Sequence, residues 1–552
     1  MLPVADTLDQ INASFEWQIP EKFNIARTCC EDWAAREPDR TALIRWGQDG
    51  DPVTTSYGDL NDYASRLANV LTGNGLKQGE RVALVLPQSL EAVAAHIAIY
   101  KAGLIAVPLA RLFAADALEF RMKRAGVSAA ITNADGFAKI SQFSDKLPDL
   151  KTVLVSGDET SKTAISLEQA VAAASPDFEA AQTTPNTPAL IIFTSGTTGP
   201  PKGALHGHRV LLGHIPGVQM HHEFMPQPGD VAWTPADWAW AGGLLNILMP
   251  CLHLGVPVVY GGLERFDPES AFRLMSEMKV TNAFIPPTAL RLMKTVENPG
   301  SRFRLSMRTI GSGGESLGKD TYEWARRELG ITINEFYGQT ECNLVLGSSG
   351  RLGVSRAGAI GKPTPGHRVA VIREDGSECD VEERGEVAVA RPDPVMFLGY
   401  WEDEAATSNK FIGDWMRTGD QCVIDADGYF HFVGRDDDII NSAGYRVGPG
   451  EIEDCLVSHP AVRLAAAVGK PDALRTEIVK AYVVLKDGFE ESDALGEEIR
   501  RHVKERLAAN IYPREIAFVD EIPLTTTGKV IRRHFREMAR VEAEAAEADH
   551  AS

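Results

Sequence analysis

The segment from Glu80 to Leu109 restricts the fold more than any other part of the sequence. It reads ERVALVLPQSLEAVAAHIAIYKAGLIAVPL, in which short runs of Val, Leu and Ile flank an alanine-rich stretch with helical spacing. This pattern predicts a strand, a helix and a strand. The stretches VSAAITN, KTVLVSG and PALIIFT add further apolar runs of strand length. Buried strands that alternate with helices predict an α/β fold with layered parallel sheets.

The pattern changes after residue 350 and resets near Ile452. The stretches HRVAVIRED and GEVAVARP are short alternating strands, and Asp-Gly turns follow, which predicts a small β subdomain. From Ile452 onward, helical and strand patterns alternate again and predict a separate small α/β domain. The acidic, glycine-containing join GRDDDIINSAGYRVGPGE is typical of a hinge. The tail EAEAAEADHAS is expected to be a frayed end.

Charge and composition exclude several classes of protein. The 552 residues carry a formal net charge of −20, which disfavours nucleic acid or an anionic membrane as the main partner. The seven cysteines are odd in number and form no CxxC, so we expect neither a disulfide framework nor a zinc site, and a reducing, cytoplasmic location. The apolar stretch 242–262 is interrupted by Asn, Pro, His and Gly, so it predicts a buried helix, turn and strand and no membrane segment. A homo-oligomer is compatible with the sequence.

A loop rich in glycine and hydroxyl groups, TSGTTGPPKG, follows the predicted strand PALIIF. Its backbone N–H groups, its hydroxyls and one lysine can converge on a single point, which predicts an anion-binding cradle. The spacing is not GxxxxGK[ST], so the loop is not a Walker A loop. A flexible surface loop is the alternative, but it explains neither the preceding strand nor the lysine. The candidate phosphate-binding residues are Thr194, Ser195, Gly196, Thr197, Thr198, Gly199 and Lys202.

This loop closely resembles the phosphate loop of the AMP-forming adenylating enzymes, which include acyl-CoA synthetases, firefly luciferase and peptide-synthetase adenylation domains. Further segments resemble that family in the family's own order: GSGGES (311–316), YGQTE (337–341), RTGD (417–420), GRDDDIINSAGYRVGPGEIE (434–453) and PLTTTGK (523–529). The hinge segment is most similar to that of the medium-chain acyl-CoA synthetases. The resemblance implies that a carboxylic acid and ATP form an acyl-adenylate and pyrophosphate, and that CoA then displaces AMP. ATP, Mg²⁺ and CoA are the implied cofactor and co-substrates.

The resemblance implies a role for each nucleotide-site residue. Thr340 would bind the α-phosphate, and Glu341 would bind Mg²⁺. Tyr337 would stack on adenine, Asp420 would accept both ribose hydroxyls, and Arg435 would contact the ribose from the hinge side. The edge of the adenine would be lined, largely through the backbone, by Gly314, Glu315 and Ser316.

The C-terminal segments would act in two arrangements of a mobile small domain. Asp437 matches the family's hinge, which divides the chain into an N-terminal AMP- and acyl-binding domain, 1–436, and a mobile C-terminal domain, 437–552. Lys529 would reach the carboxylate and α-phosphate during adenylation, and Arg446 would lie near the phosphates. Gly444 would let pantetheine pass close to the backbone. Lys504 matches a cation for the CoA phosphate, although a solvated helix surface explains it equally well.

The acyl pocket is predicted from small residues. Acetyl-CoA synthetase closes its pocket with a tryptophan at the position of Gly338, and DWAWAGG (237–243) aligns with the family's acyl-pocket segment. Small residues here favour a medium-chain, branched or aromatic acid over acetate. Two alternatives stay open: Trp238 refills the space, or the glycines serve only backbone geometry. The candidate pocket residues are Trp238, Trp240, Ala241, Gly242, Gly313 and Gly338.

The leading functional hypothesis is an ATP-dependent acyl-CoA ligase. The alternatives are a short-chain, acetate- or propionate-type ligase, and an adenylation enzyme that loads a carrier-protein thiol. A nucleotide-binding regulator without catalysis is the hypothesis from another class. The carboxylates Glu341 and Asp420 and the cations Arg435 and Lys529 argue against it.

Overall fold

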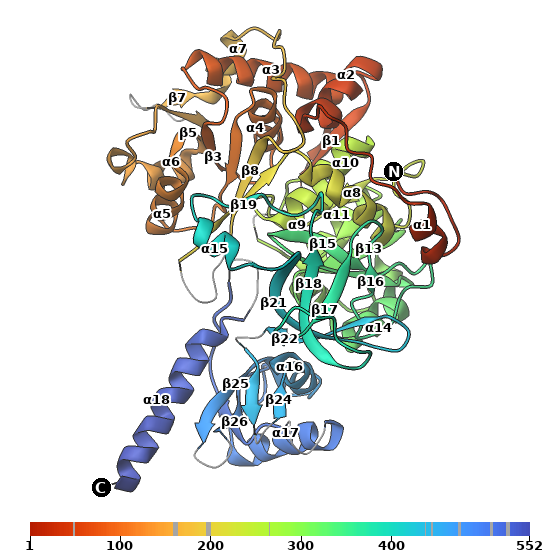
Figure 1. Cartoon of the computed structure of the whole chain (residues 1–552), viewed down its shortest axis with the longest axis vertical. Coiled ribbons are helices and arrows are strands. Elements are labelled where there is room, and N and C mark those ends of the chain that lie inside the picture. Colours follow the sequence, from red (N-terminus) through yellow and green to blue (C-terminus); the bar gives the residue numbers. More distant parts are fainter. Residues whose placement is uncertain are drawn as a thin grey trace.

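The computed structural model of the chain describes residues 1–47, 50–157, 164–194, 200–263, 265–435, 438–442, 445–472, 476–507, 512–525 and 530–551. Sheets and helices alternate in a large body, and a smaller unit built from the C-terminal strands and helices lies below it in Figure 1. The predicted fold class, a large layered α/β region followed by a small C-terminal α/β domain, is therefore confirmed.

One sheet contains the predicted strand–helix–strand segment. Helix α4 (Leu90–Lys101) connects the parallel strands β3 and β4, and Ser89 caps it by accepting a hydrogen bond from the N–H of Ala92. The helix is buried almost throughout, which explains its alanine-rich composition. The strand order is β19-β9-β8-β4-β3-β5-β6-β7. The bounds are β3 Arg81–Val85, β4 Ile105–Pro108, β5 Val127–Asn133, β6 Thr152–Ser156, β7 Ile165–Ser166, β8 Pro188–Phe193, β9 Gly203–Gly207 and β19 Gly399–Tyr400.

A second sheet brings further motif segments to one edge. Its order is β16-β15-β14-β13-β12-β10-β11-β1-β2, and β10 to β14 run parallel, so their carboxyl ends lie on the same side. The bounds are β1 Thr41–Gly47, β2 Gly50–Ser56, β10 Ala232–Trp233, β11 Val258–Tyr260, β12 Asn282–Phe284, β13 Thr309–Gly313, β14 Ile333–Gln339, β15 Cys342–Gly347 and β16 Lys362–Pro363.

The apolar stretch 242–262 has the predicted helix–turn–strand form. Helical segments run from Ala241 to Leu254, Gly255 ends them with a left-handed φ of 73°, and β11 follows. In the described parts of the chain, no helix is both long enough and apolar enough to cross a membrane.

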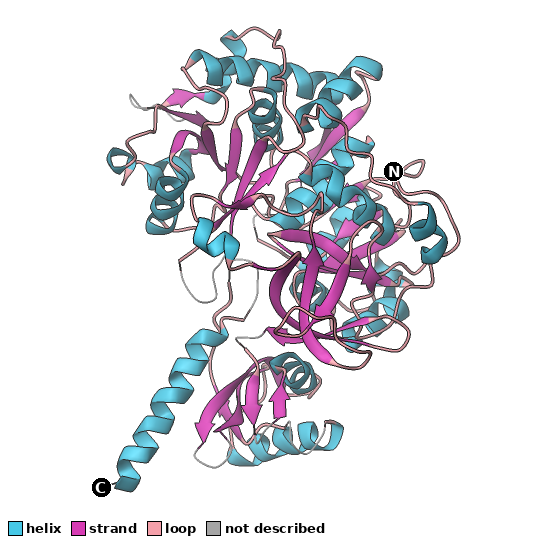
Figure 2. Cartoon of the chain, in the orientation of Figure 1, coloured by secondary structure: helices cyan, strands magenta, loops and turns pink. Residues whose placement is uncertain are grey.

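The predicted β subdomain is an antiparallel sheet, visible among the magenta strands of Figure 2. Its strands are β17 Val369–Ile372, β18 Arg384–Ala390, β20 Phe411–Ile412, β21 Trp415–Ile424 and β22 Phe430–Arg435. Strands β21 and β22 form a hairpin that pairs Asp420 with Arg435. The residues predicted to contact the ribose, Asp420 and Arg435, are therefore neighbours on adjacent strands.

The C-terminal sheet consists of β23 Ile440–Ser442, β24 Tyr445–Val447, β25 Val462–Asp472, β26 Thr476–Leu485 and β27 Glu515–Phe518. Helices α16 (Pro449–Val457), α17 (Asp493–Arg506) and α18 (Arg532–Ala551) accompany it, and Ser492 caps α17. The expectation of a frayed tail is wrong, because α18 continues to Ala551. Phe535 and Ala539 are buried on one face of this helix. The rest of the helix is rich in Ala and Glu, which have high helix propensity.

The remaining α-helices belong to the large body. They are α1 Leu8–Ser14, α2 Asp32–Arg36, α3 Tyr57–Gly73, α5 Ala115–Ala125, α6 Ala134–Ile140, α7 Leu167–Ala173, α8 Val210–His221, α11 Pro268–Glu277, α12 Pro287–Met293, α13 Pro299–Arg302, α14 Lys319–Trp324 and α15 Glu404–Ser408.

Candidate active site

The two ends of the predicted phosphate loop are held together as a hairpin. Strand β8 ends at Phe193, β9 begins at Gly203, and these two residues pair. The N–H of Thr194 donates to the carbonyl of Lys202 at 2.9 Å. The candidates Ser195, Gly196, Thr197, Thr198 and Gly199 lie outside the described residues.

Asp420 is the centre of the predicted ribose site. It is 4% exposed, and the hydroxyl of Tyr337 donates to its Oδ2 at 2.6 Å. The Nη1 of Arg435 lies 3.4 Å from Oδ1. Burial, and then the charge of Asp420, raise the pKa of Tyr337, which keeps the phenol a neutral donor. The structure therefore brings together three residues that the sequence predicted for one nucleotide.

Gln339 is a site residue that sequence reasoning missed. Its Nε2 donates to Asp420 Oδ2 and to the carbonyl of Thr418, both at 2.7 Å. Its Oε1 lies 3.4 Å from the Nζ of Lys410. The available signal was its place inside YGQTE, where an amide can orient the neighbouring carboxylate.

Glu341 and Lys202 meet at Tyr400, a second residue that sequence reasoning missed. Glu341 is 6% exposed, and the hydroxyl of Tyr400 donates to its Oε1. The Nζ of Lys202 lies 5.3 Å from the centroid of the Tyr400 ring, within reach of a cation–π interaction. The predicted Mg²⁺ ligand and the predicted phosphate-binding cation therefore share one tyrosine.

The donor set around Glu341 fits magnesium. Mg²⁺ is usually bound by one or two carboxylates together with substrate phosphates and water. No group of three His, Cys, Asp or Glu side chains suited to a metal occurs among the described residues, so a resident all-protein cage is not formed there. Glu341 is the carboxylate that would hold the ion, which would neutralise charge on the phosphates.

Thr340 and Glu341 form the tip of a hairpin. Gln339 pairs with Cys342 across β14 and β15, so the two residues between them make the turn. His206 packs beside the backbone of Thr340 and is 1% exposed. Burial lowers the pKa of His206 to about 3, so the ring stays neutral. This agrees with a structural role for the imidazole.

At the predicted adenine edge, the side chain of Glu315 is occupied. Its Oε2 accepts from Arg291 at 2.6 Å, and its Oε1 accepts from the N–H of Thr288 at 3.0 Å, at the start of α12. Gly314 has a φ of +97°, a conformation that favours glycine, and the space beside it is open. Any contact of this segment with a base would therefore come from the backbone and Ser316.

The glycines predicted to open the acyl pocket have close neighbours, so the absence of a side chain there does not by itself leave empty space. A Cβ on Gly338 would lie 2.1 Å from the backbone N of Leu344, because Gly338 forms a bulge in the β14–β15 hairpin. A Cβ on Gly242 would lie 2.9 Å from the Phe284 ring, and one on Gly313 would lie 2.5 Å from the carbonyl oxygen of Phe336. At Gly338, the alternative interpretation, in which the glycine serves backbone geometry, explains the residue.

Aromatic side chains surround these positions. Trp238 is 4% exposed, with its ring centroid 6.1 Å from that of Tyr260, and Trp240 meets Phe113 edge to face at 5.8 Å. Phe284 and Phe336 lie 5.3 Å apart. Ala241 is buried. The assignment of the pocket stays a prediction, and aromatic rings lie next to its candidate residues.

The predicted C-terminal contributors are described only in part. Asp437, Gly444, Lys529 and the side chain of Arg446 lie outside the described residues. Lys504 is exposed, and its Nζ lies 5.4 Å from the ring centroid of Tyr512.

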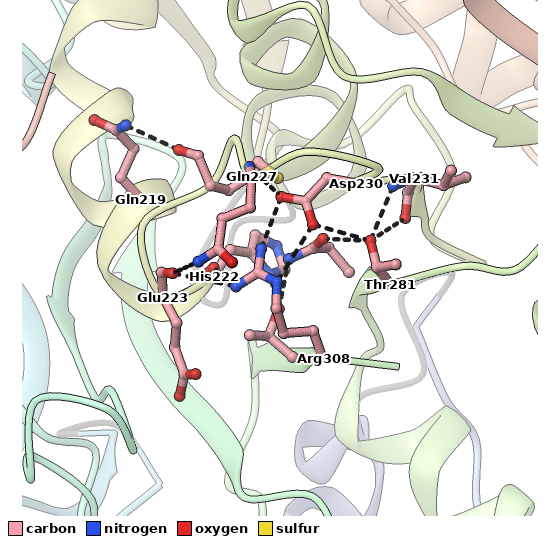
Figure 3. Close-up of polar contacts among 11 residues, drawn as sticks. Gln219, His222, Glu223, Gln227, Asp230, Val231, Thr281 and Arg308 are labelled. Atoms are coloured by element: carbon pink, nitrogen blue, oxygen red, sulfur yellow. Dashed lines mark hydrogen bonds and ion pairs between the residues drawn. The ribbon is translucent and has the colours of Figure 1, made fainter. Parts of the chain in front are cut away.

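A buried polar network anchors the strands behind the site (Figure 3). Arg308 Nη2 lies 2.7 Å from Asp230 Oδ2, and Arg308 Nη1 donates to the carbonyls of His222 and Glu223. The hydroxyl of Thr281 donates to Asp230 Oδ1 at 3.2 Å. The network joins the C-terminal end of α8 to the beginnings of β10, β12 and β13.

Comparisons with known proteins agree with this arrangement. The AMP-binding enzyme family model matches residues 30–401, and the model of the AMP-binding enzyme C-terminal domain matches residues 451–529. The uncharacterized acyl-CoA ligase YtcI of Bacillus subtilis (strain 168) is 34% identical over 521 residues, which cover 94% of this chain and 96% of that protein. The human mitochondrial acyl-coenzyme A synthetase ACSM1 is 32% identical over 535 residues, which cover 94% of this chain and 92% of ACSM1.

A solved structure shares the whole fold. The anthranilate CoA ligase AuaEII in complex with anthranoyl-AMP matches with a TM-score of 0.87 and 26% identity, covering 95% of this chain and 99% of that chain. The chain therefore belongs to the AMP-binding enzyme family. It is an acid–thiol ligase of the AMP-forming acyl-CoA synthetase class, and its substrates are a carboxylic acid, ATP and CoA.

Proposed function

We propose that this ligase prefers a medium-chain, branched or aromatic carboxylic acid to acetate, and that the site assembled around Asp420 and Glu341 binds the ATP. The observation that carries the site assignment is the convergence of Tyr337, Asp420 and Arg435 from separate motifs. Alongside them, Lys202 and Glu341 meet at Tyr400.

In the first half-reaction, a carboxylate oxygen of the acid attacks the α-phosphorus of ATP. The bond from that phosphorus to the bridging oxygen breaks, and pyrophosphate leaves with the electron pair. Both reactants are anionic, so neutralising their charge and holding them in line supplies most of the catalysis. Lys202, Thr340 and Lys529 are our candidates for that stabilisation, and Asp420 with Tyr337 and Arg435 would fix the nucleoside.

In the second half-reaction, the CoA thiolate attacks the acyl carbon and AMP leaves with its phosphate oxygen. We propose that residues 437–552 rotate about Asp437 between the two halves, as the resemblance of the hinge segment implies. Lys529 and Arg446 would act before the rotation, and Gly444 and Lys504 after it.

The preference for larger acids has two supports. The aromatic rings of Trp238, Trp240, Phe284 and Phe336 lie near the predicted pocket and offer flat apolar surface for a larger acid. AuaEII, a structural neighbour, is an anthranilate CoA ligase. A short-chain acid is the alternative, and we propose no physiological acid.

The test is product analysis with a panel of acetate, propionate, hexanoate and benzoate, with and without CoA. We expect acid-dependent AMP and pyrophosphate, acyl-CoA only when CoA is present, and the highest kcat/KM with hexanoate or benzoate. ADP as the nucleotide product would contradict the ligase mechanism. A kcat/KM that is highest for acetate would overturn the preference alone.

Loading of a carrier-protein thiol is distinguished by the same panel, because such an enzyme releases pyrophosphate without forming acyl-CoA. We propose the cytoplasm as the location, on the odd cysteine number and the absence of CxxC in the sequence.

A further inference from the structure

We call the segment between Leu524 and Val530, which carries Lys529, the lysine loop. The residues at its two ends are paired with each other. The backbone of Leu524 bridges that of Val530, and the N–H of Ile531 donates to the carbonyl of Pro523 at 2.9 Å. These contacts close the stem of the segment that carries Lys529, which itself lies outside the described residues. Helix α18 begins directly after the stem, at Arg532. Any shift of the start of α18 would therefore move the paired residues that close this segment.

Two arginines of α18 bind two carboxylates near the hinge. Arg532 binds Glu453 of α16 with both Nε and Nη2, at 2.8 and 2.5 Å, and its Nη1 lies 3.1 Å from Asp438 Oδ2. One helical turn later, Arg536 Nη1 donates to Asp438 Oδ1. We call Asp438, Glu453, Arg532 and Arg536 the hinge clamp.

The hinge clamp is shielded from water. The side chains of Asp438 and Glu453 are 11% and 12% exposed, and that of Arg532 is 21% exposed. Burial acts to lower the pKa of Arg532, but the charges of Glu453 and Asp438 outweigh it and raise the pKa. Glu453 also accepts from the N–H of Ala467 in β25 at 2.9 Å. Bidentate, partly desolvated pairs of this kind fix geometry more firmly than exposed ion pairs.

The hinge clamp also connects to the nucleotide site. The N–H groups of Asp438 and Ile439 both donate to the carbonyl of Arg435, at 3.1 Å each. Arg435 in turn lies against Asp420. A short series of contacts therefore runs from the predicted ribose carboxylate, across the hinge segment, to the root of the lysine loop.

We propose that the four residues of the hinge clamp are positioning residues, which fix the lysine loop relative to the hinge so that the lysine arrives correctly for adenylation. The proposal rests on the proposed function, in which Lys529 serves adenylation and not thioester formation. The hinge clamp does not touch substrate. Its loss should therefore lower the rate of the first half-reaction and leave the second half-reaction and ATP binding intact.

The experiment measures the two half-reactions separately in the full-length enzyme. Acid-dependent exchange of labelled pyrophosphate into ATP reports adenylation, and conversion of supplied acyl-adenylate with CoA reports thioester formation. For Arg532→Gln and Asp438→Asn we expect adenylation kcat to fall about 10- to 100-fold, the loss typical of charged, partly buried hydrogen bonds. The KM for ATP and the thioester rate should change less than about 2-fold. Arg532→Lys should restore part of the rate, because it keeps the charge but not the fork.

Two variants of α18 serve as controls. Arg533→Gln removes an exposed arginine next to the hinge clamp. Glu542→Gln removes one of the two carboxylates that pair with Lys480, and with it a contact that docks the same helix on β26 away from the hinge clamp. Both should leave the ratio of the two half-reactions unchanged, although Glu542→Gln should lower the thermal midpoint. If Arg532→Gln fails to fold, Arg536→Gln replaces it, because the Arg532–Glu453 pair then remains.

Equal loss of both half-reactions in the hinge-clamp variants, or the same selective loss in Glu542→Gln, would overturn the proposal. Lys529→Ala separates this outcome from failure of the proposed function. If Lys529→Ala does not selectively lose adenylation, the role assigned to the lysine is wrong. If it does and the hinge-clamp variants do not, only the hinge clamp is wrong.

Discussion

At Tyr400, one hydroxyl holds the carboxylate that would bind magnesium. The hydroxyl donates to Glu341, and the ring faces Lys202. Tyr400→Phe removes the hydrogen bond but keeps the ring, so we expect adenylation kcat to fall about 10-fold, since a hydrogen bond to a charged group contributes roughly 1.5–3 kcal/mol. The Mg²⁺ concentration for half-maximal rate should rise. Tyr322→Phe, whose hydroxyl pairs with Ser355 at 2.8 Å, is the control, and an unchanged Mg²⁺ dependence in Tyr400→Phe would contradict this role.

At Gly338, the structure changes what a substitution should do. If Gly338 only opened the acyl pocket, Gly338→Trp would shorten the acyl range and spare ATP binding, whereas any Cβ here meets the backbone of Asn343 and Leu344. Even Gly338→Ala should therefore distort the hairpin that carries Thr340 and Glu341, lowering the thermal midpoint and kcat for all acids alike. Gly73→Ala, with nothing within 4 Å of the added Cβ, is the control. A stable Gly338→Ala enzyme with a narrowed acyl range would restore the pocket interpretation.

Many of the residue contacts could not be read from the sequence. The motifs predicted which side chains would form the nucleotide site, and Tyr337, Asp420 and Arg435 do converge. Gln339 and Tyr400 were not predicted, because they bind carboxylates that only the tertiary fold brings close to them. At Gly338 the sequence leaves two interpretations open, because a missing side chain looks the same in sequence whether it opens a pocket or permits a bulge.

At the scale of elements, the Asp230–Arg308 pair holds α8 and strands β10, β12 and β13 in place (Figure 3). Asp230 is 7% exposed, so its removal leaves a guanidinium without its buried partner. We expect Asp230→Asn to lower the free energy of unfolding by about 3 kcal/mol, as when one partner of a buried pair is lost. Denaturant titration measures this loss. A change as small as that of an exposed pair, for example Arg540→Gln on α18, would contradict it.

The elements themselves follow local sequence closely. Short apolar runs became β3 to β6 and β8, and Ser492 caps α17, because pattern and capping act over a few residues. The C-terminal tail differed because helix propensity and the buried face of α18 together extend the helix to Ala551. A charged, alanine-rich tail gives no local sign of the sheet on which the first turns of the helix dock.

At the scale of the whole molecule, the carboxylates of Glu335 and of Asp454, which belongs to α16, lie near the segment 317–318 of the large body. The N–H of Leu317 donates to Glu335 Oε1 at 3.4 Å, and a Cβ on Gly318 would lie 3.5 Å from Asp454 Oδ2. Burial raises the pKa of Glu335 to about 8, against the effect of the Leu317 N–H, and Asp454 adds to the rise. In this arrangement Glu335 therefore favours its protonated form.

The sign of the pH dependence follows from that raised pKa. The stabilising contribution of protonated Glu335 is fully present below its ordinary pKa of 4.5 and is lost as the pH rises through about 8. The slope should not exceed about 1.4 kcal/mol per pH unit for one proton. Thermal midpoints of wild type and Glu335→Gln between pH 5 and pH 9 measure it, and we expect a flatter profile for the variant. Parallel profiles would show that Glu335 does not titrate in this range.

The proposed mechanism requires an acyl-adenylate that forms before CoA takes part. The most direct test is the exchange of labelled pyrophosphate into ATP by the full-length enzyme, with Mg²⁺ and hexanoate or benzoate but without CoA. We expect exchange that requires the acid, that is at least about 100-fold slower in Lys529→Ala, and that needs no thiol. Exchange that appears only when CoA is added, or that proceeds equally well without any acid, would contradict it.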